Sequence, residues 1–166
     1  MALIDTLLQE LEEEAKTTRR VLERVPENQL DWRPHQKART LGQLAMHVAI
    51  VPGGVAKFVA APSPAQAPNF SDPNLPSASE LVPILDQSIT QAKQVLGGME
   101  DAELMATWRL MQGERELFAG PRLGMLRSIM LNHWYHHRGQ LSVYLRALDV
   151  PLPSIYGPSA DENPFA

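Results

Sequence analysis

Four stretches of the chain place apolar residues three and four positions apart, which is the spacing of an amphipathic α-helix. In the first stretch, charged side chains fill the opposite face, which predicts a solvated surface. Prolines and capping sequences separate the stretches, so each is predicted to form a separate helix. The predicted helices cover residues 3–25, 40–60, 81–99 and 125–148.

The second predicted helix has a proline in its middle. Thr40 and Gln43 match the S/T-x-x-E/Q capping box at its start, and the apolar spacing resumes after Pro52. Proline has no N–H, so the carbonyl of Val48 is expected to lose its usual helical partner. We therefore expect one kinked helix, with a backbone defect close to His47.

The connections between these helices are long. Residues 61–76 contain five prolines. Such a long connection predicts either a crossover strap or a lid over a site, and we favour the strap because it requires fewer assumptions. Residues 100–120 predict either a short hairpin or extended chain laid over the helices. Four amphipathic helices joined by such links predict an all-α four-helix bundle, with a single domain over residues 1–166.

Three of the five histidines lie close together in the last predicted helix. The inward stripe of that helix is predicted to run through Leu126, Met130, His133, His137, Leu141, Tyr144 and Leu148. His133 and His137 thus occupy a face expected to be apolar, and imidazoles four residues apart on a helix point the same way. His47 is predicted on the inward face of the second helix.

Burying three imidazoles without a shared partner is costly, so we favour a metal site over a polar network in the core. Three nitrogen ligands leave coordination positions open for water or substrate, as in catalytic sites. Imidazoles suit Zn, Ni, Fe and Cu and do not choose among them. The spacing differs from the H-E-x-x-H motif of zinc proteases, because Trp134 follows His133 where that motif has glutamate.

Four further residues are candidates for contacts with the ligands or with a substrate: Gln43, His136, Gln140 and Tyr144. Gln140 either orients a ligand or substrate or is a polar residue at a wet bundle end, and the sequence favours neither. The capping box already explains Gln43. His136 points about 100° away from His137, so both cannot serve one ion equally well. Arg138 is expected to pair with a carboxylate rather than to serve the site.

Charge and composition exclude several classes of protein. The net charge is −4 and no lysine or arginine cluster is present, so nothing indicates a nucleic-acid surface. No apolar run approaches a membrane span and the polar N-terminus does not resemble a signal peptide, so we expect a cytoplasmic protein. The chain has no cysteine, so any thiol chemistry requires a thiol from outside.

Four segments of the chain form a recognisable set: DWRPH at 31–35, LGQLAMH at 41–47, HWYHHRGQL at 133–141 and IYGPSADE at 155–162. Together they resemble the DinB family of damage-inducible, YfiT-like metalloenzymes. The resemblance spans nearly the whole chain. It implies an up-down-down-up four-helix bundle, often a homodimer, with a divalent metal held by one histidine of the second helix and two of the fourth. Matched residue by residue, these ligands are His47, His133 and His137.

The resemblance also implies a class of activity. Some relatives are metal-dependent transferases that use a low-molecular-weight thiol such as bacillithiol or mycothiol. We therefore expect a homodimeric metalloenzyme acting on a small molecule, with Zn or Ni ahead of Fe or Mn as the ion. Two alternatives stay open: a metal-dependent hydrolase, for which His136 is the candidate general base, and a noncatalytic, stress-associated metal-binding dimer.

Overall fold

The computed structural model describes residues 2–68 and 73–165, so residues 69–72 of the predicted 61–76 strap lie outside the described residues. Most of the described chain is helical. The α-helices are α1 (Leu3–Leu22), α2 (Leu41–Ala60), α3 (Leu81–Leu96), α4 (Asp101–Met105), α5 (Arg122–Met125) and α6 (His133–Ala147). Two short 3-10 turns are η1 (Glu27–Gln29) and η2 (Ala78–Glu80), and a π-helical segment is η3 (Leu126–Asn132). The strands are β1 (Ala65–Gln66), β2 (Thr107–Gln112) and β3 (Arg115–Pro121).

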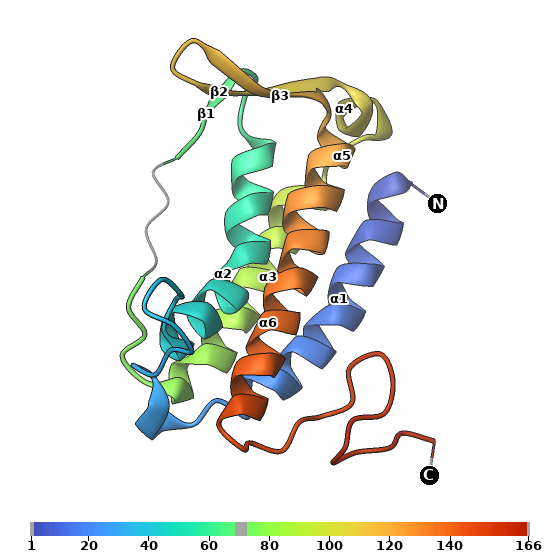
Figure 1. Ribbon diagram of the computed structural model, residues 1–166. Coiled ribbons are helices and arrows are strands. Elements are labelled where there is room, and N and C mark those ends of the chain that lie inside the picture. Colours follow the sequence, from blue (N-terminus) through green and yellow to red (C-terminus); the bar gives the residue numbers. More distant parts are fainter. Residues whose placement is uncertain (1, 69–72, 166) are drawn as a thin grey trace.

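The long helices lie side by side, and α5, η3 and α6 run on as one helical segment (Figure 1). Helix α2 packs against both α3 and α6, and α1 also contacts α3 and α6. The termini of α2 follow the predicted boundaries, with the Thr40–Gln43 capping box formed at its start. These contacts bring the inward faces of all four long segments to one core.

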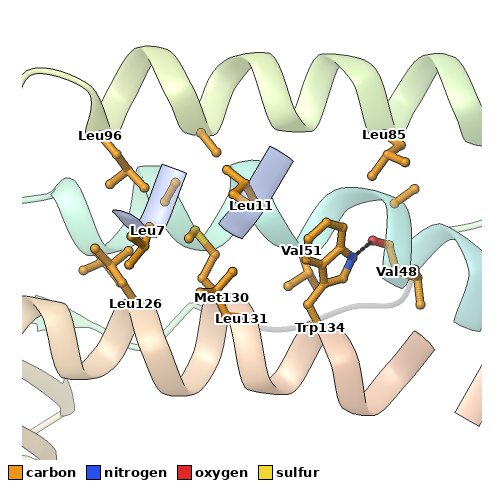
Figure 2. Close-up of a cluster of buried hydrophobic side chains, with 14 of the residues drawn as sticks. Leu7, Leu11, Val48, Val51, Leu85, Leu96, Leu126, Met130, Leu131 and Trp134 are labelled. Atoms are coloured by element: carbon orange, nitrogen blue, oxygen red, sulfur yellow. Dashed lines mark hydrogen bonds between the residues drawn. The ribbon is translucent and has the colours of Figure 1, made fainter. Parts of the chain in front are cut away.

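Leucine, valine, methionine and tryptophan side chains from each long segment meet in that core (Figure 2). The labelled members are Leu7, Leu11, Val48, Val51, Leu85, Leu96, Leu126, Met130, Leu131 and Trp134. Burying a large apolar side chain contributes about 1.5–3 kcal/mol, so we expect the helices to persist when no ion is bound.

A small mixed sheet covers one end of the helices (Figure 1). β2 pairs antiparallel with β3 through a turn in which Gly113 has a positive φ of 59°. Of the two alternatives for residues 100–120, the hairpin is therefore confirmed over Thr107–Pro121, whereas Asp101–Met105 form the short helix α4, which was not predicted. The all-α expectation is wrong in one respect, because β1 from the proline-rich strap adds a third strand parallel to β2.

The last helical segment differs from the prediction in its phase. The π-helical turns of η3 insert extra residues, which rotates the following helix relative to a regular α-helix. As a result the fully buried line of α6 runs through Trp134, Arg138, Leu141 and Leu145. Of the predicted stripe, Leu126, Met130, His137 and Leu141 are buried as expected, whereas His133, Tyr144 and Leu148 are half-buried at the edge of the core.

Helix α2 is long and apolar enough to cross a membrane by length and composition alone, contrary to the expectation that no segment approaches this limit. About half of its apolar window is buried against the rest of the protein. The same composition is needed by a central helix that packs against neighbours on several sides.

Candidate metal centre

Three histidines from two helices converge beside the core. His47 comes from α2, and His133 and His137 come from α6. Their potential ligand atoms all lie within 4.8 Å of one another, and the Nε2 atoms of His47 and His133 are 3.0 Å apart. The ring centroids are separated by 4.4 Å between His133 and His137 and by 4.5 Å between His47 and His137. The three residues named from the sequence are thus brought together.

Helical spacing explains why two of the three rings meet, and helix packing brings in the third. His133 and His137 are one helical turn apart, so both rings leave α6 on the same side. His47 lies on the side of α2 that faces α6, next to the buried Val48. His137 is buried, whereas His133 and His47 are half-buried, so the cluster sits where the core meets the surface.

Gln140 orients one of the three rings. Its Oε1 lies 2.8 Å from Nδ1 of His137 and accepts a hydrogen bond when that nitrogen carries the proton. This tautomer leaves Nε2 of His137 unprotonated and available as a ligand. Of the two roles considered for Gln140, this hydrogen bond is consistent with orientation of the His137 ring, although the Gln140 side chain is itself exposed.

Burial favours the neutral form of His133 and His137. Loss of solvation lowers the pKa of His137 to about 4, against an opposing effect of the Gln140 hydrogen bond. Loss of solvation also lowers the pKa of His133, with smaller contributions from His136 and the positive charge of Arg39. Neutral imidazole is the form that binds metal ions, so at pH 7 these side chains are ready to act as ligands.

The lowered pKa of His137 predicts how the stability of the metal-free protein depends on pH. A histidine that titrates near 6.5 when unfolded and near 4 when folded binds more protons in the unfolded state between these values. Its contribution to stability is present above about pH 6.5 and is lost as the pH falls toward 4. We expect the free energy of unfolding of metal-free protein, measured by urea titration, to fall in this window.

A pair of variants isolates this effect from that of the carboxylates. His137→Asn is expected to flatten the pH dependence between 6.5 and 4, whereas His35→Asn, which changes an exposed loop histidine, is expected to leave it as in the wild type. Equal pH dependence in wild type and His137→Asn would show that His137 is not held in the neutral form by burial.

The remaining candidates lie around the cluster with separate contacts. The carboxamide oxygen of Gln43 accepts from the Thr40 backbone N–H, which is the capping role. The His136 side chain is exposed, with its ring centroid 5.0 Å from that of His137. The Tyr144 hydroxyl donates to the Arg39 carbonyl at 3.4 Å, and the Tyr144 ring packs edge-on against Trp32.

Two residues near the histidines were not singled out from the sequence. Arg39 influences the pKa of both His133 and His137, and nothing in its loop context pointed to this. Trp134 donates its indole N–H to the carbonyl of Val48 at 2.8 Å. The proline at position 52 had predicted a carbonyl in need of a donor, so a signal for the second contact was present in the sequence.

Comparisons with known proteins agree with the fold. The model of the DinB family matches residues 1–163. The uncharacterized protein YrdA of Bacillus subtilis (strain 168) is 27% identical over 161 residues, which cover 96% of this chain and 91% of YrdA. A DinB-like protein from Bacillus cereus ATCC 10987 superposes with a TM-score of 0.66 at 21% identity, covering 92% of this chain and 97% of that one. The DinB-like protein YjoA of Bacillus subtilis gives a TM-score of 0.66 at 15% identity, with 90% and 96% covered.

Proposed function

The chain belongs to the DinB family, and from that premise we propose that it is a metal-dependent enzyme whose divalent ion is held by His47, His133 and His137. The observation that carries the proposal is the convergence of three imidazoles whose ligand atoms lie within 4.8 Å of one another. Ions such as Zn²⁺ hold imidazole nitrogens at about 2.0–2.1 Å, so small side-chain rotations bring all three into range.

The donor set fits a borderline transition metal. Three neutral imidazole nitrogens suit such metals without choosing among them, and we propose Zn or Ni ahead of Fe or Mn. Gln140 holds the ring of His137 through Nδ1 and so fixes the direction of Nε2. Three protein ligands would leave part of the coordination sphere for a substrate. The half-buried exposure of His47 and His133 supports a position for the ion at the edge of the core.

The reaction we propose is transfer of a low-molecular-weight thiol to an electrophilic small molecule. When bound, a divalent ion lowers the pKa of an entering thiol from its usual value near 8.5 and so supplies thiolate at neutral pH. The chain has no cysteine, so the sulfur comes from the cosubstrate. The thiol proton passes to solvent, the carbon–sulfur bond forms, and the leaving group, for example a halide, departs with its electron pair.

This reaction is tested by pairing bacillithiol, mycothiol and glutathione with a haloaromatic compound, with and without Zn, Ni, Mn or Fe. We expect at least one thiol to react faster than the uncatalysed rate, only with metal present. If thiol transfer is absent while a screen of hydrolysable substrates responds to metal, the hydrolase replaces this reaction, with exposed His136 beside His137 as the candidate base. If both screens stay at the background rate, the noncatalytic metal-binding role replaces it.

The proposal extends to architecture and assembly. We propose the up-down-down-up bundle of the family as one domain over residues 1–166, working as a cytoplasmic homodimer. Exposed apolar side chains at Met105, Leu117 and Tyr156 supply contact surface for a second copy. Sedimentation at micromolar concentration is expected to give twice the mass of the chain, and a monomer there would contradict the dimer.

A further inference from the structure

A hydrogen bond between two helices is built on the proline of α2. Pro52 has no N–H for the carbonyl of Val48, and its ring crowds that carbonyl away from the helix axis. The indole N–H of Trp134, on α6, donates to this carbonyl at 2.8 Å (Figure 2). Trp134 is fully buried, so the donor and the acceptor satisfy each other away from water.

This bond lies at the level of the three histidines. Val48 directly follows His47, and Trp134 directly follows His133. The hydrogen bond therefore joins the neighbours of two proposed ligands that come from different helices. The Nε2 atoms of those ligands are 3.0 Å apart, a separation that depends on the register of α6 against α2.

The same stretch of α2 is held from its other side by α3. The Ser88 hydroxyl accepts from the Gly53 backbone N–H at 2.8 Å and lies 3.2 Å from the Ile50 carbonyl, to which it donates. A Cβ at Gly53 would come within 2.7 Å of the Ser88 carbonyl oxygen, so α2 and α3 approach closely here. The interrupted turn of α2 is thus fixed by α3 on one side and by Trp134 on the other.

We propose that Trp134 is a positioning residue for the metal centre: its hydrogen bond to the Val48 carbonyl sets the register in which His47 and His133 meet. This inference rests on the proposed function, since it concerns the same three histidines. Trp134 touches neither the ion nor a substrate in this account, and it acts through the backbone next to His47. Contacts that orient ligands in this way typically change metal affinity by about 10–100-fold when they are lost.

The test compares two tryptophans that make the same kind of bond. Trp134→Phe removes the indole N–H and keeps an aromatic ring in the core. Trp108→Phe is the matched control, because Trp108 is also fully buried and donates to a backbone carbonyl, that of Ala61, at 3.2 Å. Binding of Co²⁺ is followed by its visible absorption, and thermal unfolding of the metal-free proteins is measured in parallel.

We expect Trp134→Phe to lower Co²⁺ affinity at least about tenfold and to change the absorption spectrum of the bound ion. Trp108→Phe is expected to lower the melting temperature while leaving affinity and spectrum as in the wild type. If Trp134→Phe lowers only the melting temperature, Trp134 is a core residue and the inference is wrong. If the wild type binds no Co²⁺, Zn²⁺ or Ni²⁺, the proposed function itself fails.

Pro52→Ala provides a rescue that examines the hydrogen bond directly. This change returns a backbone N–H at position 52, which can bond to the Val48 carbonyl within α2. The loss of Co²⁺ affinity caused by Trp134→Phe is expected to be smaller in the Pro52→Ala background than in the wild-type background. An equal loss in both backgrounds would show that Trp134 does not act through that carbonyl. The melting temperatures of the metal-free proteins are expected to show the same coupling between the substitutions at positions 52 and 134, and this measurement needs no ion.

Discussion

Replacing His137 by alanine is expected to abolish metal binding and thiol transfer together. His137 is the buried member of the cluster and lies within 4.5 Å, between ring centroids, of both other histidines. Without it, two half-buried imidazoles on different helices remain, which is too few for a stable site at micromolar metal. Equilibrium dialysis followed by metal analysis measures the loss, and circular dichroism checks that the helices persist.

Gln140→Ala separates holding the ion from orienting its ligand. This variant removes the partner of His137 Nδ1 and keeps all three imidazoles. We expect it to retain the metal, with affinity lowered about tenfold, and to reduce the rate of thiol transfer or the affinity for substrate. His35→Ala, in an exposed loop, serves as the control for histidine loss and is expected to behave as the wild type. Undiminished metal binding by His137→Ala would contradict the proposed ligand set.

The second large effect is expected from Glu14→Ala, which leaves a buried positive charge without its partner. The guanidinium of Arg138 is 1% exposed and lies 2.6 Å from the Glu14 carboxylate. It is also placed over the rings of Tyr135 and Tyr156, at 5.3 Å and 5.1 Å from their centroids. Removing one partner of a buried pair typically costs about 3–5 kcal/mol, so we expect the melting temperature to fall by about 10 °C.

Glu13→Ala is the matched control for this prediction. Glu13 is the neighbouring carboxylate on α1, and it pairs with Lys16 at the surface, where both side chains are more than 60% exposed. Exposed pairs contribute about 0–1 kcal/mol, so this variant is expected to melt close to the wild type. Similar melting temperatures for the two variants, measured by calorimetry, would show that the buried pair does not stabilise the fold.

The candidate site was largely predictable because its residues are related by local helical spacing. His133 and His137 are one turn apart, and Gln140 follows on the same side, so the period of an α-helix places them together. That His47 meets them depends on how α2 packs against α6, and here the sequence offered an apolar face and a family resemblance. The expectation that Arg138 pairs with a carboxylate was also correct, although its partner Glu14 lies 124 positions earlier in the chain.

Features that depend on distant parts of the chain or on unusual backbone were not predictable. The π-helical turns of η3 have no local sequence signal comparable to a capping box, and they moved Trp134 and Arg138 into the buried line of α6. β1 contains two residues and exists through its pairing with β2, more than 40 positions later. In both cases contacts with other parts of the chain decide the conformation. The helical spacing of apolar residues predicts only what a segment forms without such contacts.

X-ray absorption spectroscopy of the zinc-loaded protein reports the ligands of the bound ion and so examines the three-histidine site itself. We expect one zinc per chain, with three imidazole nitrogens at about 2.0–2.1 Å and a further light-atom ligand in the open position. In His47→Ala and His133→Ala the imidazole contribution is expected to vanish with the bound ion. A zinc ion bound by fewer than three imidazoles in the wild type, or bound unchanged in these variants, would contradict the proposed metal centre.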